Sequence, residues 1–124
     1  MSDGVNRQPL RPGAGEMLSF KIMDEAVRLK SKPEWSSATR MSVSLVKDDA
    51  LNILLMVLKK GAQLPEHRTK GPIALQVVSG LIRFTAGGKH AELSSGSIVA
   101  LDREIAHEVE ALEESVVLLT TAIE

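Results

Sequence analysis

The chain of 124 residues is long enough for one domain, and with one Trp, two Phe and no Tyr its core must be built from aliphatic side chains. The net charge of −1, with both signs interspersed, leaves no clustered basic face for a nucleic acid, and the absence of Cys excludes disulfides and thiolate chemistry. We expect a cytoplasmic protein that does not enter a membrane, because the longest apolar run, 53–58, is too short to span one and no signal peptide is visible.

The N-terminal part of the chain is expected to lie outside the main fold. Residues 1–16 combine glycines and prolines with polar groups, a composition that predicts a flexible tail. Residues 17–39 are predicted to hold a short helix and the lead-in to the next part, with Asp24 as the helix cap and Pro33 as the residue that stops it. We interpret Trp35 as a packing residue near the entry to a barrel.

From residue 40 onward the pattern of apolar residues is typical of β-strands. Met41, Val43 and Leu45 alternate with serines and predict a half-buried strand, whereas the run 51–58 is apolar on both faces, as in a covered strand. Further apolar runs end at turn residues, and they cover 73–78, 81–86, 89–93, 97–101, 105–110 and 116–123. Short strands with turns at this spacing predict an all-β sandwich or barrel over residues 40–124.

The run 51–58 also suggests how the domain associates. A strand of a small barrel buries only one face in the barrel interior, and a second apolar face has to be covered by something else. We therefore expect a two-fold homodimer that buries 51–58 together with the C-terminal strand 116–123.

The glycines and histidines of this region have a spacing that resembles the two motifs of the cupin superfamily. At the positions of the first motif (Gly, His, His, Glu, Gly) the chain has Gly61, His67, Thr69, Ile73 and Gly80. At the positions of the second motif (Gly, Pro, Gly, His, Asn) it has Gly96, Asp102, Glu104, His107 and Ala111. The three glycines and two histidines match. The resemblance implies a double-stranded β-helix (jelly-roll) barrel like that of small, single-domain, RmlC-like bacterial cupins.

The resemblance also implies a site inside the barrel. His107 shares the strand parity of Val109, so both are expected to face the interior. His67 is expected to approach His107, with the Thr69 hydroxyl where the family has a second imidazole and Ile73 in place of the family's carboxylate. The candidate ligand-binding residues are therefore His67, Thr69, Ile73 and His107.

Only two of the four metal ligands of a typical cupin remain, His67 and His107. Catalytic zinc uses three protein ligands and a water, and non-haem iron uses two histidines and a carboxylate. We therefore predict no certain cofactor, and at most a weakly bound divalent metal completed by waters or by another side chain. The other polar side chains considered are Gln63, Gln76, His90 and Glu92, of which we interpret His90 as a surface residue.

The sequence does not define a reaction, and catalytic residues stay unassigned. The first hypothesis is a small-molecule-binding cupin without redox chemistry. The alternative is a metal-dependent or acid–base enzyme, of isomerase or dioxygenase type, that uses His67 and His107, since an imidazole suits a general base. A sensor or assembly module is a third hypothesis, which the lack of a DNA-binding segment disfavours.

Overall fold

The computed structural model describes residues 17–122 as an α-helix, a 3-10 helix and nine strands. The helices are α1 (Ile22–Lys30) and η1 (Pro33–Ser36). The strands are β1 (Arg40–Lys47), β2 (Leu51–Leu58), β3 (Gln63–His67), β4 (Ile73–Ser79), β5 (Leu81–Ala86), β6 (Lys89–Ser94), β7 (Ile98–Leu101), β8 (His107–Ala111) and β9 (Ser115–Ala122). The expected tail, residues 1–16, lies outside the described part. Neither described helix is long and apolar enough to cross a membrane.

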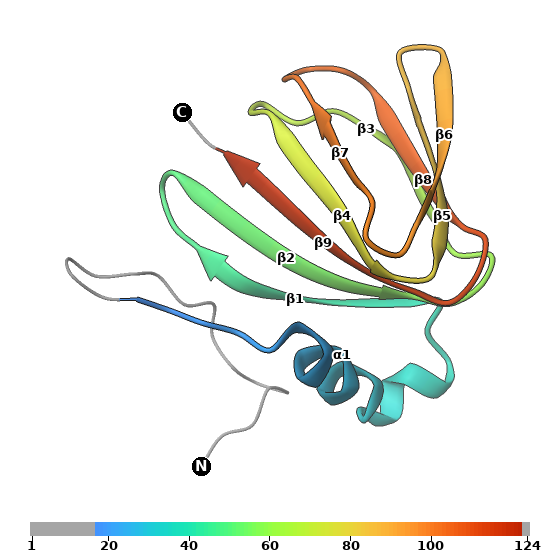
Figure 1. Ribbon diagram of the computed structural model, residues 1–124. Coiled ribbons are helices and arrows are strands. Elements are labelled where there is room, and N and C mark those ends of the chain that lie inside the picture. Colours follow the sequence, from blue (N-terminus) through green and yellow to red (C-terminus); the bar gives the residue numbers. More distant parts are fainter. Residues whose placement is uncertain (1–16, 123–124) are drawn as a thin grey trace.

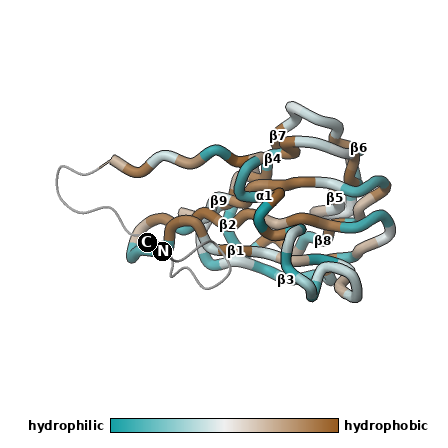
Figure 2. Tube along the Cα trace, turned by 90° about the horizontal axis from the view of Figure 1, so that it is seen from below, coloured by the Kyte–Doolittle hydropathy of each residue, from teal (hydrophilic) through white to brown (hydrophobic). Residues whose placement is uncertain are grey.

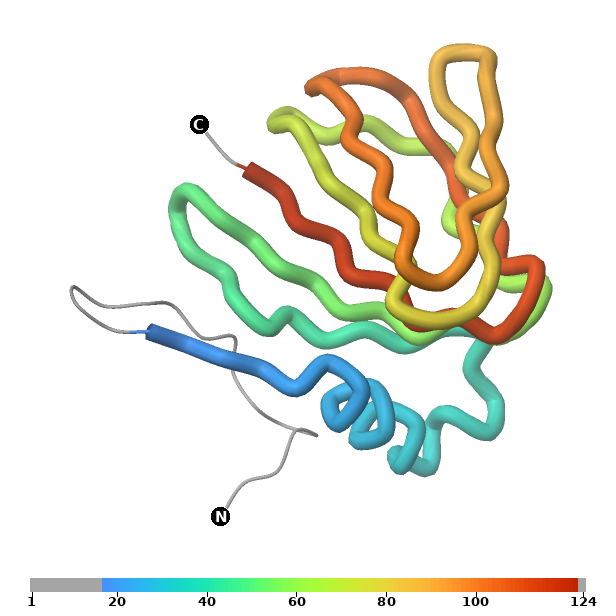
Figure 3. The backbone as a smooth tube through the Cα atoms, viewed as in Figure 1, coloured from blue at the N-terminus to red at the C-terminus, as the bar shows by residue number. Residues whose placement is uncertain are grey.

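The strands form two antiparallel sheets that face each other (Figures 1 and 3). One sheet has the order β1-β2-β9-β4-β7, and the other has the order β3-β8-β5-β6. Most neighbours in these sheets are distant in sequence, and the chain crosses repeatedly from one sheet to the other. This is a jelly roll, so the all-β fold predicted from the sequence is confirmed.

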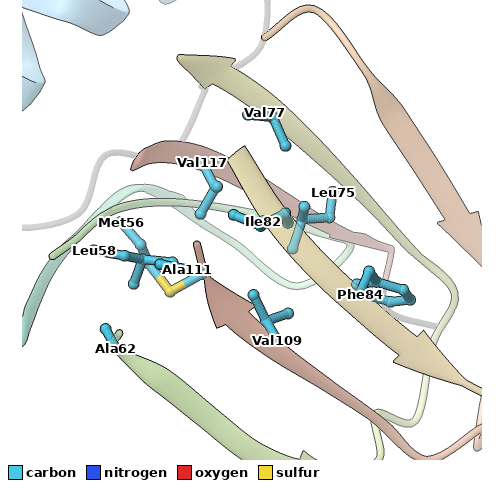
Figure 4. Packing of buried hydrophobic residues seen from close by; sticks show 10 residues of the cluster. All are labelled: Met56, Leu58, Ala62, Leu75, Val77, Ile82, Phe84, Val109, Ala111 and Val117. Atoms are coloured by element: carbon cyan, nitrogen blue, oxygen red, sulfur yellow. The ribbon is translucent and has the colours of Figure 1, made fainter. Parts of the chain in front are cut away.

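The main hydrophobic core lies between the two sheets (Figure 4). Alternate residues of each strand point inward, because successive side chains of a strand face opposite sides. The buried members of this core are Met56, Leu58, Ala62, Leu75, Val77, Ile82, Phe84, Val109, Ala111 and Val117. Both sheets contribute, so burial of this one cluster holds the sheets together.

A second hydrophobic cluster lies between α1 and the outer face of the five-stranded sheet. Figures 1 and 2 show the helix beside this sheet. Ala26 and Leu29 of α1 are buried against Leu55 and Val57 of β2, and Leu45 of β1 joins them. The strand β2 is therefore apolar on both faces because the barrel core covers one face and the chain's own helix covers the other. The homodimer stays a prediction, but this face of β2 no longer supports it.

The start of α1 differs from the sequence prediction. The helix begins at Ile22, and its N-cap residue, Lys21, makes no side-chain capping hydrogen bond. Asp24 is therefore not the cap but lies in the first turn, where its negative charge interacts favourably with the helix dipole. Pro33 follows shortly after the end of α1 at Lys30, as expected, and it also starts the 3-10 helix η1, at a position that suits its fixed φ.

Trp35 is a packing residue, as the sequence predicted. Its ring lies against the cluster under α1. The ammonium group of Lys59 lies 4.7 Å from the ring centroid and donates a hydrogen bond of 2.6 Å to the Trp35 carbonyl oxygen. The contact fastens η1 to the residue that follows β2.

The turn from β4 to β5 passes close to the turn before β9. Gly80 has a φ of +105°, and a Cβ atom added there would clash with the Ser115 hydroxyl and lie 2.6 Å from the Glu114 carbonyl oxygen. Ser115 is fully buried, and its hydroxyl accepts a hydrogen bond of 3.0 Å from the Leu81 amide. Glycine at this position therefore permits the two turns to pack together.

We predict that Gly80→Ala lowers the free energy of unfolding by about 3 kcal/mol, because backbone strain and the clash add. Gly61→Ala is the matched control, since Gly61 also has a positive φ of +88° but has open space around it. That substitution should cost only about 1 kcal/mol. Urea denaturation measures both values, and equal losses would show that the contact with Ser115 does not matter.

Candidate functional site

His107 faces the barrel interior from β8, as its parity predicted. Its side chain is buried, with the residue 3% exposed, and its ring stacks on Phe84 with 5.7 Å between ring centroids and 15° between planes. Its Nδ1 donates a hydrogen bond of 2.9 Å to the Ile105 carbonyl oxygen. The ring is therefore held by one apolar contact and one polar contact.

His67 reaches the same place because β3 contains a bulge. Leu64 pairs with Val109 and His67 pairs with His107, so two residues lie between the pairs on β3 but only one on β8. The extra residue shifts the side-chain alternation by one. Without it, Glu66 would stand opposite His107, and His67 would face outward.

The two imidazole rings contact each other, so the predicted approach of His67 and His107 is confirmed. The expectation that both lie inside the barrel is wrong for His67, which is exposed because it stands on an edge strand beside the opening of the cavity described below. The ring centroids are 4.3 Å apart and the ring planes lie at 61° in an edge-to-face arrangement. His67 Nδ1 lies 3.2 Å from the Pro65 carbonyl oxygen, much as His107 Nδ1 lies close to a carbonyl. A carbonyl oxygen can only accept, so each Nδ1 carries the hydrogen and each neutral ring presents its lone pair at Nε2. Within residues 17–122 neither Nε2 has a hydrogen-bond partner.

Thr69 and Ile73 lie near the histidines in sequence but provide no free polar group there. Thr69 follows the end of β3, and its hydroxyl donates a hydrogen bond of 2.9 Å to the Gly71 carbonyl oxygen. Ile73 is buried and shares the inward side of β4 with Leu75. The family's carboxylate position is thus occupied by an apolar side chain.

The other polar candidates point away from the histidine pair. Gln63 pairs with Glu110, and both lie on the outer face of the sheet. Because the bulge lies between Gln63 and His67, these two side chains face opposite sides, and the prediction that they share one side was wrong. Gln76 is exposed between two inward residues of β4, and His90 and Glu92 are exposed on β6. The interpretation of His90 as a surface residue is confirmed.

A cavity of about 340 Å³ opens beside His67, between β2 and β9 on one side and β3 on the other. It is lined by Arg40, Leu54, Met56, Leu64, Pro65, Glu66, His67 and Leu119. Of the four residues predicted to bind a ligand, only His67 lines this cavity; His107 contacts the His67 ring but does not line the cavity. The other lining residues were not predicted from the sequence, although Leu54 and Met56 share one parity of β2 and could have been assigned to the interior.

The donor set does not fit a tightly held metal ion. Within the described part of the chain, no group of three or more His, Cys, Asp or Glu side chains is placed to hold a metal. The histidine pair offers two nitrogen ligands, and Ile73 supplies none. A cation bound here would need water for at least half of a tetrahedral shell.

One motif position carries backbone strain. Glu104 has a φ of +64°, in the left-handed region, at the place where the cupin motif has a glycine. Its amide donates a hydrogen bond of 2.8 Å to the Thr69 carbonyl oxygen, and its own carbonyl accepts one of 2.8 Å from Arg68 Nη1. These contacts tie the turn before His107 to the segment that follows His67.

No protein-family model matches the chain, and no curated protein matches it. Solved structures do. A conserved protein of unknown function from Streptococcus pyogenes is 25% identical, with a TM-score of 0.66 over 68% of this chain and 75% of that one. A cupin superfamily protein from Desulfitobacterium hafniense is 18% identical, with a TM-score of 0.67 over 68% and 78%.

A salicylate 1,2-dioxygenase from Pseudoaminobacter salicylatoxidans, solved with gentisate, is 13% identical with a TM-score of 0.74. The match covers 82% of this chain but 32% of that longer one. Together with the two sheets and their order, these matches define the class of protein as a jelly-roll barrel. The chain has the fold of the cupin superfamily, at the size of its small single-barrel proteins, and the resemblance seen in the sequence is confirmed at that level.

We predict that Glu104→Gly raises the free energy of unfolding by up to about 1 kcal/mol. Relief of the left-handed strain is worth about 1–2 kcal/mol, and the greater entropy of glycine in the unfolded chain offsets part of it. Glu108→Gly, at an exposed position of β8, is the control and should be destabilising by about 1 kcal/mol. Thermal or urea unfolding compares the two, and a loss of stability in both would contradict the argument from strain.

The two histidines should also differ in their contribution to stability. We expect His107→Ala to cost about 2 kcal/mol or more, because it empties a buried space against Phe84. His67→Ala should cost about 0.5 kcal/mol, since His67 is exposed at the cavity edge. Urea denaturation of both variants checks this, and similar costs would mean that the pair acts as one structural unit.

Proposed function

We propose that this protein binds a small molecule in the cavity beside His67, with the imidazole pair orienting the ligand. The observation that carries the proposal is the combination of an apolar wall with an imidazole at its edge. Leu54, Met56 and Leu119 supply the apolar surface, and His67 supplies a polar group. A largely apolar pocket with a few convergent polar groups is typical of small-molecule sites.

The volume of the cavity supports the same proposal. About 340 Å³ lies near the lower end of the range of ligand pockets, about 300–1,000 Å³, and suits a compact molecule. A hydrogen-bond donor of such a molecule could bond to His67 Nε2, which is free of partners within the described residues. His107 would act through its edge contact with His67, which restricts the orientation of that ring.

A fragment screen by NMR on protein with ¹³C-labelled methionine methyl groups tests the proposal. We expect fragments to shift the Met56 signal, at the cavity wall, and to leave that of Met23, on the exposed side of α1, unchanged. Leu54→Phe should fill the cavity and abolish the shifts, while Ile98→Phe, at an exposed position of β7, should not. A screen that never moves the Met56 signal would count against small-molecule binding.

The alternative is an acid–base enzyme, and the paired imidazoles support it. Each ring presents an unbonded Nε2 when neutral, so one ring could accept a proton from the ligand at Nε2, and the resulting imidazolium could return that proton to another atom of the ligand. Molecules found in the screen can be incubated with the protein in D₂O. Deuterium incorporation that disappears in both His67→Ala and His107→Ala would favour this alternative, and incorporation that persists would argue against it.

We predict that any divalent metal at the histidine pair binds weakly. A chelator should change the melting temperature by less than about 1 °C, because two ligands couple little binding free energy to folding. The double substitution Thr69→His with Ile73→Glu adds two ligands and should raise the affinity for Zn²⁺ sharply. Ile73→Glu alone should lower the free energy of unfolding by about 3 kcal/mol, because it buries a carboxylate. Tight stoichiometric zinc in the unmodified protein would contradict the prediction.

A further inference from the structure

The edge strand β1 presents a polar row to the cavity side of its sheet. Residues directly opposite each other in an antiparallel pair share one face. Arg40 stands opposite Leu58, Ser42 opposite Met56 and Ser44 opposite Leu54. These β2 residues face the barrel interior, and two of them form the cavity wall. The face that carries the apolar wall therefore continues, on the next strand, into Arg40, which lines the cavity, and into two serines just outside its lining.

Arg40 is held at the edge of the cavity by a contact between the two sheets. Its Nη1 donates a hydrogen bond of 2.6 Å to the Gln63 carbonyl oxygen. Arg40 lies on the edge strand of one sheet and Gln63 on the edge strand of the other, so this bond spans the seam where the cavity opens. A guanidinium has five N–H donors, so four remain after this bond as far as residues 17–122 are concerned. Its position is thus fixed in advance while most of its donors stay available.

The charges around the cavity are one cation, one carboxylate and one imidazole. Arg40, Glu66 and His67 all line it. Glu66 is exposed in the bulge of β3, and neither it nor Arg40 has an ion-pair partner within the described residues. The guanidinium is consequently the one fixed cation that faces this cavity from the strands around it.

We propose that the ligand of this cavity is a small carboxylic acid with an apolar body, whose carboxylate is bound by Arg40. The inference rests on the proposed function and adds the chemical class of the ligand. A planar guanidinium matches a carboxylate with two parallel hydrogen bonds, and the hydroxyls of Ser42 and Ser44 provide further donors on the same face. The apolar body lies against Leu54 and Met56. His67, on the opposite strand, defines the other side of the ligand.

A matched pair of probes tests the charge requirement. Hexanoate and hexanamide have the same length and shape, and only the first has a carboxylate. We expect hexanoate to shift the Met56 methyl signal and to bind at least about tenfold more tightly than hexanamide, as a charge-assisted hydrogen bond predicts. Isothermal titration calorimetry, or the NMR titration itself, gives both dissociation constants.

Substitutions at Arg40 test the assignment to that residue. Arg40→Gln should weaken hexanoate binding about tenfold and leave hexanamide binding nearly unchanged, so that the preference disappears. Arg40→Lys keeps the charge and should retain part of the preference. If Arg40 only closed the seam between the sheets, its loss would weaken both probes equally.

Two further variants distinguish the effect of the Arg40 contact from the effect of the protein's net charge. Arg83→Gln removes the same charge from the outer face of the other sheet, where Arg83 pairs with Glu92 and Glu110, and should leave the preference intact. Glu66→Gln removes the carboxylate that repels an anion at the cavity edge, and should tighten hexanoate binding by about two- to fivefold. The substitutions at Arg40 and Glu66 are thus expected to act in opposite directions.

The possible outcomes are distinguishable. A preference for hexanoate that is lost in Arg40→Gln and kept in Arg83→Gln supports the proposal. Equal binding of hexanoate and hexanamide at Met56 overturns the carboxylate assignment and leaves small-molecule binding in place. Failure of both probes to shift Met56 contradicts the carboxylate assignment and, if the fragment screen also fails, the proposed function itself.

Discussion

The position of the site depends on how β2 is packed, because this strand is covered on both faces. Leu54, Met56 and Leu58 face the space between the sheets, and Leu55 and Val57 lie under α1. A strand held in this way cannot slip by one residue without exchanging its two sets of apolar side chains. The wall of the cavity is consequently fixed by the same packing that stabilises the domain, and the helix contributes to the site although it does not touch it.

The bulge of β3 contrasts with the regular pairing of β2, because it lies on an edge strand and interrupts the pairing there. The segment from Gln63 to His67 has a single aliphatic side chain besides its proline, and no strand was predicted there. Proline is tolerated at sheet edges and bulges because it has no amide hydrogen to donate. Simple alternation fails across such a bulge, which is why the parity of Gln63 was misassigned. The approach of His67 to His107 was nevertheless predicted, because that prediction rested on the spacing of the motif residues as well as on strand parity.

Other features of the fold could be predicted from the sequence, and the structure shows the physical reasons. The apolar runs from β4 to β9 are bounded by turn residues, so their limits were predicted within about two residues of the observed ones. Gly61, Gly80 and Gly96, the matching glycines of the motifs, all have positive φ values. The cavity was not accessible in the same way, because Arg40, Leu119 and His67 come from three strands that are far apart in the sequence. Their meeting depends on the order of strands, which periodicity alone does not give.

Residues that match the motifs and residues that depart from them have different effects on the structure. The matching glycines permit the turns of the barrel, and His107 packs on Phe84, so these positions serve the fold whether or not a metal is present. The departures, Thr69 and Ile73, remove ligands from the interior. With Ile73 the interior gains apolar surface and avoids a buried charge that only a cation would compensate. Charge is instead found at the edge, on Arg40 and Glu66, where water still reaches both groups. The charged side chains around the cavity thus lie at its edge, while the position of the family's carboxylate is apolar.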